Sequence, residues 1–351
     1  MVSTPTVLVC GAGSVGRRHI ANLRTLGARV HVWRERAHES ERLAAELGLP
    51  VARDLEGAIL RSDAVVVATA TDRHMAVALP AARARKALYI EKPLANDDGQ
   101  LGELARLAHG LVVEIGCQLR AHPNLEALER RLAGATDGPA YAFRGVLGQR
   151  LDQWRPGTDY RRSYSASPER GGGALLDLVH EIDLVHWLLG PITAVSANLA
   201  RVSDLGIEAE DLANLILETK GAAVGQVQLD MLSPAYRREL EIVCRDAVYH
   251  WSYADGTLER RTEREVEVID RTPPGFGRND LFLAHMRHFV DRLGRPGLEP
   301  LCSLEDGAAV LGVALAARRS AAEGRRVALP SGPVPPGDGP PHGPKPPSDG
   351  P

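Results

Sequence analysis

The stretch "VLVCGAGSVGRRHI" (7–20) decides the fold of this chain. An apolar, strand-like run leads directly into three glycines spaced G-x-G-x-x-G, and a helical pattern starts within them. In this context Gly11 permits a tight turn, Gly13 lets backbone approach a pyrophosphate, and Gly16 lets helix and strand pack closely. The helix N-terminus then offers free N–H groups to phosphates. The motif predicts a dinucleotide site, with a purely structural glycine turn as the weaker alternative.

The pattern around this motif, up to Gln118, alternates short apolar runs with helical stretches. The strand-like runs lie at 6–10, 28–33, 64–69, 87–91 and 111–117. Alternation at this spacing predicts a parallel sheet covered by helices on both faces, and nearly all-apolar strands fit such a buried sheet. We therefore expect an α/β fold that begins with a Rossmann dinucleotide-binding domain over residues 1–118.

The pattern changes from residue 119 onward. Strand-like runs now follow one another without helices between them, at 192–202, 212–220, 223–232, 238–246 and 264–271. This order predicts an α+β domain over 119–330 with a large, mainly antiparallel open sheet. We expect two closing helices, near 281–293 and 303–322, to pack on the first domain. The Pro- and Gly-rich residues 331–351 cannot bury a core, so we expect a disordered tail.

The composition of the 351 residues is that of an ordinary globular protein, with 44% apolar and 25% charged residues. A formal net charge of −3 gives no basis for binding nucleic acid or an anionic membrane. No stretch reaches the roughly 18 to 20 apolar residues of a membrane span, and the N-terminus lacks a signal-peptide pattern. The four cysteines are scattered and form no C-x-x-C pair, so we expect reduced thiols, no metal site and a cytoplasmic location.

The end of the second predicted strand bears on the choice of cofactor. Rossmann domains that bind NAD usually carry an acid at this position, which bonds the adenine ribose. Here "VHVWRER" (30–36) places Arg34 there and Glu35 one residue later. An arginine can meet a 2′-phosphate, so NADP is favoured. NAD remains an alternative, because a shift of one residue brings Glu35 to the position of the acid.

The run "LYIEKPLAN" (88–96) ends an apolar strand in Glu91, Lys92 and Pro93. Lysine and glutamate are seldom fully buried without partners. A solvated strand end is the plain interpretation. The catalytic interpretation is that Lys92 exchanges a proton with a substrate oxygen while hydride is transferred at the adjoining carbon.

Five segments together make the chain resemble the Gfo/Idh/MocA oxidoreductases, the family of glucose-fructose oxidoreductase and inositol dehydrogenase. They are "GAGSVGRRH" (11–19), "DAVVVATATDRH" (63–74), "EKPLA" (91–95), "GCQLRAHP" (116–123) and "GGGALLDLVHEIDLVHWLLG" (171–190). The likeness covers nearly the whole chain except the tail. The second segment departs from the usual Thr-Pro of the family, because Ala70 replaces the proline.

The resemblance assigns roles to several of these residues. It implies that Lys92 reaches the reacting hydroxyl or carbonyl beside the nicotinamide, that Glu91 lies near the nicotinamide ribose, and that a cis peptide bond precedes Pro93. The predicted cofactor-binding residues are Gly11, Gly13, Ser14, Val15, Gly16, Arg34, Thr69, Ala70, Thr71, His74, Glu91 and Lys92.

Three glycines at 171–173 precede an apolar helical run. Glycines at the tight start of a helix explain them better than a second phosphate loop. Asp177 and His180 are three residues apart and project from one helix face, whereas most family members space them four apart. A lone helix histidine is more often structural, but here we predict that His180 relays a proton with Lys92, oriented by Asp177 or Asp183. The predicted catalytic residues are Lys92, His180 and Asp177.

The loop before this helix concentrates aromatic and arginine side chains. Trp154, Tyr160 and Tyr164, with Arg155 and Arg161 beside them, suit stacking against a sugar and binding an attached phosphate or carboxylate. A tethered surface loop is the alternative interpretation.

Arg120 and His122 follow the last predicted Rossmann strand, at the sheet edge where ligands bind in such folds. Combined with the loop and the helix, they complete the predicted substrate contacts. The predicted substrate-binding residues are Lys92, Arg120, Trp154, Tyr160, Tyr164 and His180.

These features predict an NAD(P)-dependent oxidoreductase that moves hydride between nicotinamide and a secondary alcohol or ketone of a sugar, cyclitol or nucleotide sugar. One alternative is a non-catalytic dinucleotide-binding regulator, which needs neither Lys92 nor His180. Another is redox-assisted glycoside cleavage with recycled NAD. We expect a small-molecule substrate and no nucleic-acid or membrane partner.

We also expect a homodimer or homotetramer. One face of the second sheet would be open, and the run at 223–232 supplies apolar side chains that this face would expose. The resemblance implies the same, because the family pairs these sheets face to face.

Overall fold

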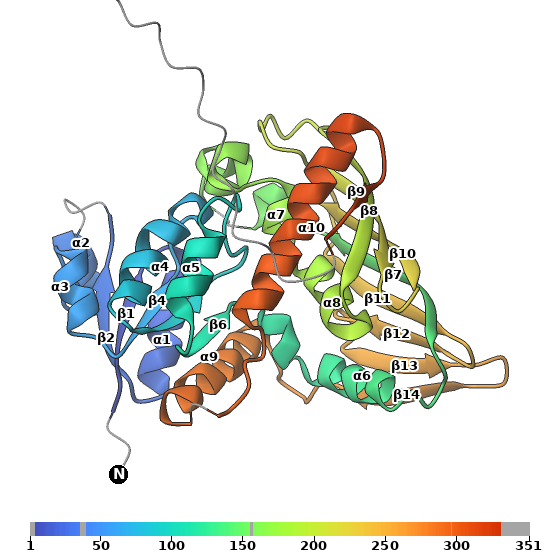
Figure 1. Cartoon of the computed structure of the whole chain (residues 1–351), viewed down its shortest axis with the longest axis horizontal. Helices are drawn as coiled ribbons and strands as arrows, with labels where there is room; N and C mark the ends of the chain where they lie inside the picture. Colours follow the sequence, from blue (N-terminus) through green and yellow to red (C-terminus); the bar gives the residue numbers. More distant parts are fainter. Residues whose placement is uncertain (1–3, 36–39, 155–156, 296, 331–351) are drawn as a thin grey trace, which may run out of the picture.

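The structure is a computed structural model that describes residues 4–35, 40–154, 157–295 and 297–330. Two β-sheets lie on opposite sides of a layer of helices (Figure 1). No helix in these four ranges is both long and apolar enough to cross a bilayer. The tail predicted to be disordered, 331–351, lies outside the described residues.

The first sheet has six parallel strands in the order β3-β2-β1-β4-β5-β6. They are β1 (Thr6–Cys10), β2 (Arg29–Trp33), β3 (Val51–Ala52), β4 (Ala64–Val67), β5 (Ala87–Ile90) and β6 (Val113–Ile115). All four residues of β4 are buried, as the apolar pattern predicted. The strand order reverses between β1 and β4, and ligands bind at the carboxyl ends of the strands beside such a reversal.

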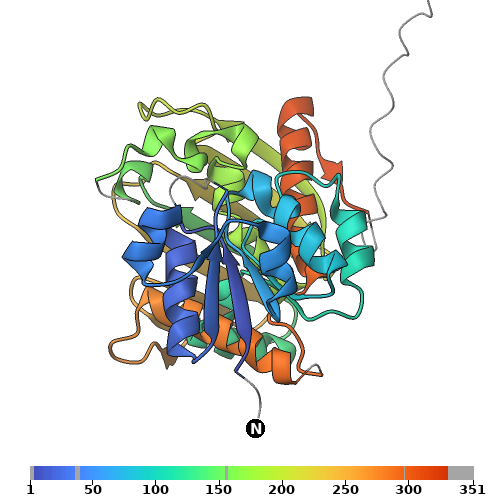
Figure 2. The same ribbon diagram turned by 90° about the vertical axis from the view of Figure 1, so that its left-hand side faces the viewer.

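Helices cover both faces of this sheet (Figure 2). They are α1 (Ser14–Thr25), α2 (Ser40–Leu47), α3 (Leu55–Leu60), α4 (His74–Arg83) and α5 (Leu101–Ala108). From far along the chain, α9 (Arg278–Gly294) returns to lie beside α1. Its Met286 and Phe289 pack with Val7 and Val9 of β1, so a late segment completes the first core.

The second sheet has nine strands in the order β14-β13-β12-β11-β7-β10-β9-β8-β15. They are β7 (Ala140–Gly148), β8 (Ile192–Ala200), β9 (Leu212–Thr219), β10 (Val224–Asp230), β11 (Arg237–Cys244), β12 (Val248–Ser252), β13 (Thr257–Arg261), β14 (Val266–Arg271) and β15 (Val327–Ala328). Strands β10 and β7 pair in parallel, and the other pairings of this sheet are antiparallel. The prediction of a large, mainly antiparallel sheet is confirmed.

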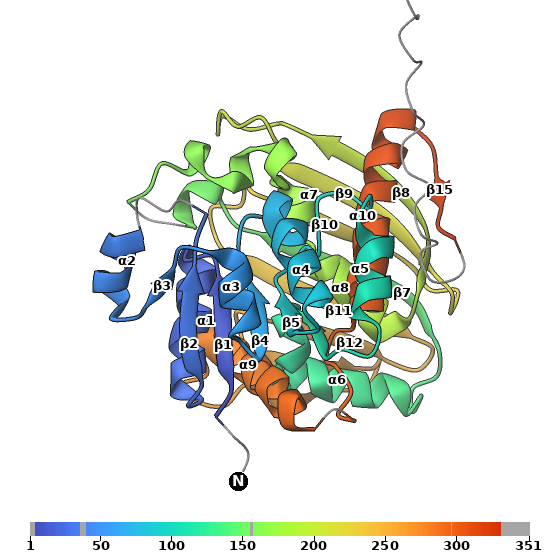
Figure 3. The same cartoon turned by 60° about the vertical axis from the view of Figure 1, so that its left-hand side comes forward.

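Helices cover the face of the second sheet that is turned toward the first domain (Figure 3). They are α6 (Pro123–Ala133), α7 (Ala174–Asp177), α8 (His180–Leu189) and α10 (Leu304–Glu323). We expected α10 to pack on the first domain, but it packs mainly on β8 and α8. It meets the first domain at its start, where a Cβ on Gly307 would lie 2.9 Å from Cγ1 of Ile115. The expectation was wrong for most of α10, because β8 and its neighbours supply the apolar surface that this helix covers.

The open face of the second sheet is more polar than we expected. In β10 the side chains of Val227 and Leu229 are buried beneath the helices, whereas Gln226 and Gln228 are exposed. Side chains alternate between the two faces of a strand, so Val227 and Leu229 point inward, whereas Val224 lies on the open face and is 46% exposed. The expectation that this run exposes its apolar residues was therefore wrong for Val227 and Leu229 and right for Val224.

Candidate active site

The glycine loop between β1 and α1 leaves room for a dinucleotide. Gly11 has a φ of +105°, and a Cβ on it would lie 2.3 Å from the carbonyl oxygen of Ala68. A Cβ on Gly16 would lie 2.1 Å from the carbonyl oxygen of Gly11, so packing fixes both glycines. At Gly13 no atom lies within 4 Å of the equivalent position. Open space is therefore found where a pyrophosphate must approach the backbone.

Helix α1 begins at this open space, and no side chain caps the N–H groups of its first turn. Its N-cap is Gly13, and Ser14 and Val15 are the first helical residues. Uncapped first-turn N–H groups favour anions such as phosphate. In the neighbouring loop, Oγ1 of Thr69 is buried with no hydrogen-bond partner among the described residues. The residues present fit a dinucleotide.

His74 ties two loops together. Its ring nitrogens each lie 3.3 Å from a backbone carbonyl oxygen, one of Thr69 and the other of Leu94. Burial lowers the pKa of this histidine. The ring positions the loop that continues through Ala70 into η2 (Thr71–Arg73), and its predicted contact with the cofactor stays a prediction.

Arg34 lies at the crevice beside the glycine loop. The N–H of Gly11 donates to the carbonyl of Trp33 at 2.9 Å, so the residue after Trp33 is a direct neighbour of the loop. Glu35 points to an arginine, with its Oε1 3.4 Å from Nη2 of Arg73. The carboxylate near this position is thus already paired with a cation.

Glu91 joins the end of β5 to the glycine-loop helix. Its Oε1 lies 2.6 Å from Nε2 of His19 on α1, and its Oε2 accepts the N–H of Lys92 at 3.2 Å. Burial alone would raise the pKa of Glu91, but the hydrogen bond and charge of His19 hold it below its ordinary value. The pair connects the helix that meets the phosphates to the residue beside the catalytic lysine.

The Lys92 side chain reaches from the first domain to the second. A cis peptide bond links it to Pro93, as the resemblance implied. Its Nζ donates to the backbone carbonyl of Asp177 at 2.6 Å and lies 3.5 Å from Oδ1 of the same residue. Tyr164 donates its hydroxyl to that Oδ1 at 2.9 Å. The ammonium is therefore fixed at the domain junction next to a carboxylate that a phenol also holds.

The helix predicted across 171–190 is broken between Asp177 and His180. Helix α7 ends at Asp177 and α8 begins at His180. The Oδ1 of Asp177 contacts Lys92 and Tyr164, and its Oδ2 has no hydrogen-bond partner among the described residues. The prediction that Asp177 orients His180 is corrected, because this carboxylate is directed to the lysine instead.

His180 is buried close to Gln118. Its Nε2 lies 3.4 Å from the amide nitrogen of Gln118, while its Nδ1 finds no partner in the described part of the chain. Burial, followed by the charges of Lys92 and Arg238, lowers the pKa of His180 well below its ordinary value. The imidazole is therefore neutral near pH 7 and able to accept a proton.

The site contains buried polar atoms that the protein itself does not satisfy. Within the described ranges they include Oγ1 of Thr69, Oε1 of Gln118, Oδ2 of Asp177 and Nδ1 of His180. Buried polar groups nearly always have partners, and each missing one costs about 1 to 3 kcal/mol. A ligand that supplies these bonds is stabilised here. The sequence interpretation missed Gln118, although it occupies the same sheet edge from which we chose Arg120.

Arg120 does not face the site. Its guanidinium donates to Asp183 at 2.6 to 3.2 Å, to Asp306 at 3.0 Å and to the carbonyl of Leu301 at 2.9 Å. The prediction of substrate contact is corrected, because these bonds use all three guanidinium nitrogens. The same bonds correct the alternative role of Asp183, which holds Arg120 and not His180.

The aromatic loop brings Tyr164 to the site and uses its other rings elsewhere. Trp154 donates its indole N–H to the carbonyl of Gln149 at 3.0 Å. Tyr160 donates to the carbonyl of Leu205 at 3.0 Å. Both side chains are partly buried against the core, and their assignment as sugar platforms stays a prediction. Arg155 lies outside the described residues.

Two predicted neighbours of the site also have structural partners. Arg161 lies 5.4 Å from the centroid of the Tyr160 ring. His122 caps α6 by accepting the N–H of Asn124 at 3.2 Å, and burial lowers its pKa to about 4. The lowered pKa keeps the imidazole neutral, so that its Nδ1 can accept this hydrogen bond. His122 therefore serves as a helix cap and not as a substrate contact.

The three glycines before α7 are explained by protein contacts. A Cβ on Gly171 would lie 2.7 Å from Cβ of Thr71 in the cofactor loop. Gly173 has a φ of +98°, and a Cβ there would lie 2.3 Å from Oε1 of Glu210. That carboxylate also accepts the N–H of Leu175 at 3.1 Å. The glycines therefore let the second domain approach the first, and Glu210 was invisible to sequence reasoning because it is distant in the chain.

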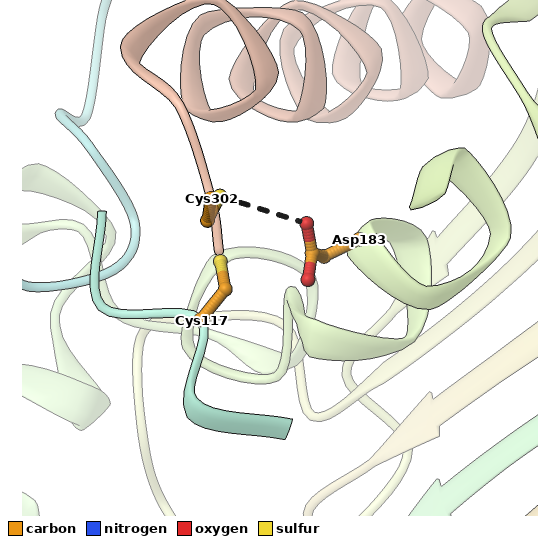
Figure 4. A group of neighbouring side chains, drawn as sticks. All are labelled: Cys117, Asp183 and Cys302. Carbon is orange, nitrogen blue, oxygen red and sulfur yellow. Dashed lines mark hydrogen bonds between the residues drawn. The ribbon is translucent and has the colours of Figure 1, made fainter. Parts of the chain in front are cut away.

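Cys117, Asp183 and Cys302 gather behind the site (Figure 4). Their donor atoms lie within 4.8 Å of one another. Burial raises the pKa of the Cys302 thiol well above its ordinary value, and Asp183 already accepts three hydrogen bonds from Arg120. Protonated thiols and an occupied carboxylate do not fit a metal ion.

The fold and the site define the class of the protein. A doubly wound sheet with an open glycine loop, joined to a junction that holds a lysine, a carboxylate and a neutral histidine, is the arrangement of a dinucleotide-dependent oxidoreductase. Residues 6–116 match the family model "Oxidoreductase family, NAD-binding Rossmann fold". Residues 136–250 match the "GFO/IDH/MocA C-terminal domain". The chain belongs to the Gfo/Idh/MocA family of oxidoreductases.

Curated relatives align over most of the chain. It is 25% identical over 341 residues to scyllo-inositol 2-dehydrogenase (NAD(+)) of Bacillus subtilis, covering 92% of this chain and 95% of the relative. It is 26% identical over 255 residues to UDP-N-acetylglucosamine 3-dehydrogenase of Acidithiobacillus ferrooxidans, covering 71% and 74%. The crystal structure of GenD2 from gentamicin A biosynthesis in complex with NAD aligns with a TM-score of 0.77 at 28% identity, covering 94% and 98%.

Proposed function

We propose that this protein transfers hydride between a nicotinamide cofactor and a secondary alcohol or ketone of a sugar, cyclitol or nucleotide sugar. One observation carries the proposal: the Lys92 ammonium lies 2.6 Å from the carbonyl of Asp177 and 3.5 Å from its carboxylate, where the dinucleotide domain meets the second domain. The names of the relatives, an inositol dehydrogenase and a UDP-sugar dehydrogenase, support the substrate class.

The residues of this chain supply the proton chemistry. The nicotinamide, when bound, accepts or gives the hydride. In the oxidative direction the hydroxyl on the reacting carbon must also lose a proton. Lys92 contacts that oxygen, with Asp177 and Tyr164 fixing the ammonium. His180, kept neutral by burial, accepts the proton and returns it when the reaction runs toward the alcohol.

The test is the release of reduced cofactor by the full-length chain with scyllo-inositol, myo-inositol, UDP-N-acetylglucosamine and glucose. We expect one of these to reduce the cofactor with wild type and not with Lys92→Met. Glycoside cleavage without release of reduced cofactor would replace the proposal with recycled redox chemistry. Dinucleotide binding without turnover of any alcohol or ketone would favour a regulator.

We propose further that NADP is preferred over NAD. Arg34 supports this proposal by its position and charge, and the pairing of Glu35 with Arg73 supports it too. The NAD of the similar GenD2 structure is the contrary indication. Titration of Arg34→Asp should raise the Kd for NADP by about 10- to 100-fold and leave that for NAD nearly unchanged, as expected for one lost charged hydrogen bond. Equal effects on both cofactors would contradict the preference.

We also propose a cytoplasmic homodimer or homotetramer. The free, buried cysteines support a reducing compartment. Ile216 and Val224, 47% and 46% exposed, lie with exposed Asn214 and Gln226 on the open face of the second sheet. Light scattering at micromolar concentration tests the assembly, and a strictly monomeric species would overturn it.

A further inference from the structure

A group of arginine and tyrosine side chains adjoins the proposed catalytic residues. The first is Arg18 on α1, which precedes the His19 that bonds Glu91. The Cζ of Arg18 lies 4.5 Å from the ring centroid of Phe282 on α9. This arginine therefore extends from the glycine-loop helix toward the start of α9, on the side of the strand end that carries Lys92.

A second arginine, Arg278, is the first residue of α9. Asn22 and Asn279 exchange side-chain hydrogen bonds of 3.4 and 3.0 Å, so the first turn of α9 lies alongside α1. With Arg18 against Phe282 and Asn22 against Asn279, the two helices run in opposite directions. Arg278 and Phe282 are four residues apart and share a helix face, so Arg278 lies on the side of α9 that meets Arg18, and its charge acts on that arginine.

The opposite wall comes from the second sheet. Arg238 of β11 pairs with Glu181, which follows His180, with 2.7 Å between Nε and Oε1. The N–H of Tyr253 donates to the carbonyl of Arg238 at 3.0 Å. The rings of Tyr253 and Tyr236 meet edge to face with centroids 5.6 Å apart. The hydroxyl-bearing rings and the third arginine thus lie next to the proposed proton acceptor.

The charges in this region do not balance. Glu181 compensates Arg238, and the carboxylate of Asp177 lies beside Lys92. Arg18 and Arg278 have no ion pair with any residue that the structure describes. Burial and then the charge of Arg278 lower the pKa of Arg18, and the charge of Glu91, whose carboxylate is bonded to His19, raises it. Two cations that repel each other beside a ligand site favour an anion between them.

We propose that Arg18 and Arg278 form a subsite for an anionic group, a phosphate or a carboxylate, attached to the sugar whose alcohol reacts at Lys92. The open α1 N-terminus at Gly13 is the expected place of the cofactor pyrophosphate, and Arg18 lies about one and a half helical turns further along the helix, so we assign the anion to the substrate. Tyr236 and Tyr253 offer ring faces and hydroxyls to the adjoining part of the molecule. This proposal rests on the proposed function. Within the substrate class proposed there, the subsite would select anionic sugars over neutral ones.

The test is binding to the full-length chain preloaded with NADH, measured calorimetrically with uridine diphosphate, glucuronate and myo-inositol. The variants are Arg18→Gln, Arg278→Gln and both together. Arg287→Gln is the matched control, because Arg287 is an exposed arginine further along α9. All variants are first compared by melting temperature and by titration with NADH.

We expect uridine diphosphate or glucuronate to bind wild type more tightly than myo-inositol. Each arginine variant should lose about 10- to 100-fold in affinity for that anion, as for a charged hydrogen bond, with the control unchanged. Tighter binding of uridine diphosphate would indicate a nucleotide sugar as the substrate, and tighter binding of glucuronate would indicate a sugar acid. Equal anion affinity in wild type and the double variant would overturn the subsite, as would an equal loss of NADH affinity, which would assign the arginines to the cofactor.

Release of reduced cofactor separates this proposal from the function on which it rests. Arginine-dependent anion binding without hydride transfer to any alcohol would refute the proposed function and leave the subsite. Oxidation of neutral inositols at equal rates by wild type and the double variant, with no anion bound, would refute the subsite and leave the function.

Discussion

Two buried ionic clusters lie at the junction of the domains, and they differ in how completely their polar atoms are paired. In the cluster of Arg120, the guanidinium is bonded by Asp183, Asp306 and a backbone carbonyl. In the cluster of Lys92, Oδ2 of Asp177 and Nδ1 of His180 have no hydrogen-bond partner among the described residues. The sequence placed Arg120 and Lys92 together as substrate contacts, and the structure separates them.

The difference shows how to tell a structural ion cluster from a catalytic one. A fully bonded buried ion pair contributes to stability mainly because breaking it leaves an unpaired charge. A cluster with unpaired atoms is costly to the free protein and is stabilised when a ligand supplies partners. Substitutions in the Lys92 cluster should therefore lower activity, and those in the Arg120 cluster should lower stability.

The largest effect is expected from Lys92→Met. The variant keeps the length of the side chain but has no proton to exchange, so kcat should fall by about 10²- to 10⁴-fold, the range for a lost general acid–base group. Its melting temperature and dinucleotide Kd should stay close to wild type. Lys220→Met, at an exposed lysine, is the control and should leave turnover unchanged. Near-wild-type turnover by Lys92→Met would return the lysine to the role of a solvated strand end.

Arg120→Met should show the opposite signature. Removing the guanidinium leaves the buried Asp183 without its cation, which should lower the free energy of unfolding by about 3 to 5 kcal/mol. The kcat of the folded fraction should stay within a few-fold of wild type. Denaturant unfolding and turnover, measured on the same preparation, check both expectations.

The control for this experiment is a surface pair of the same chemistry. Arg326 and Glu218 form an exposed ion pair with N–O distances of 2.5 and 2.6 Å. Arg326→Met should cost at most about 1 kcal/mol, because solvent screens such pairs. If Arg120→Met abolished turnover at normal stability, Arg120 would belong to the catalytic cluster after all.

Tyr164→Phe tests the edge of the catalytic cluster and should have a smaller effect. It removes the hydroxyl that donates to Oδ1 of Asp177 at 2.9 Å. A hydrogen bond to a charged group contributes about 1.5 to 3 kcal/mol, so kcat should fall by about 10- to 100-fold with little change in dinucleotide Kd. A double variant with Asp177→Asn should lose less than the product of the two single effects, since both act on one carboxylate. Independent, multiplying losses would place Tyr164 outside this cluster.

The sequence predicted those features that depend on neighbours in the chain. The glycine loop, the parallel sheet around it and Lys92 at a strand end all follow from local spacing and from apolar patterning. The role of Arg120 could not be predicted in this way. Its partner Asp183 is 63 residues away and Asp306 is 186 away, so only the folded chain shows that its donors are used.

The same reason explains the break between α7 and α8. The apolar pattern of 171–190 is continuous, yet the helix stops at Asp177, whose carbonyl accepts the Lys92 ammonium at 2.6 Å. A backbone carbonyl at a helix end is free to accept such a bond, and nothing in the local sequence marks the lysine that supplies it. The local sequence likewise does not show the partner of Tyr164, which we predicted to be a sugar platform. Its hydrogen bond to Asp177 is a tertiary contact that only the folded chain shows.

The smallest effect is expected from pH, and it concerns His180. Burial, and then the charges of Lys92, Arg238 and Arg278, lower the pKa of His180 well below 6.5 in the folded protein. With an ordinary pKa of 6.5, only about a tenth of this imidazole would be neutral at pH 5.5. With the lowered pKa it stays neutral, so the kcat/KM profiles of wild type and His180→Gln should run parallel between pH 5.5 and 7. An inflection near pH 6.5 in wild type that is absent from the variant would contradict the lowered pKa and the neutral proton acceptor.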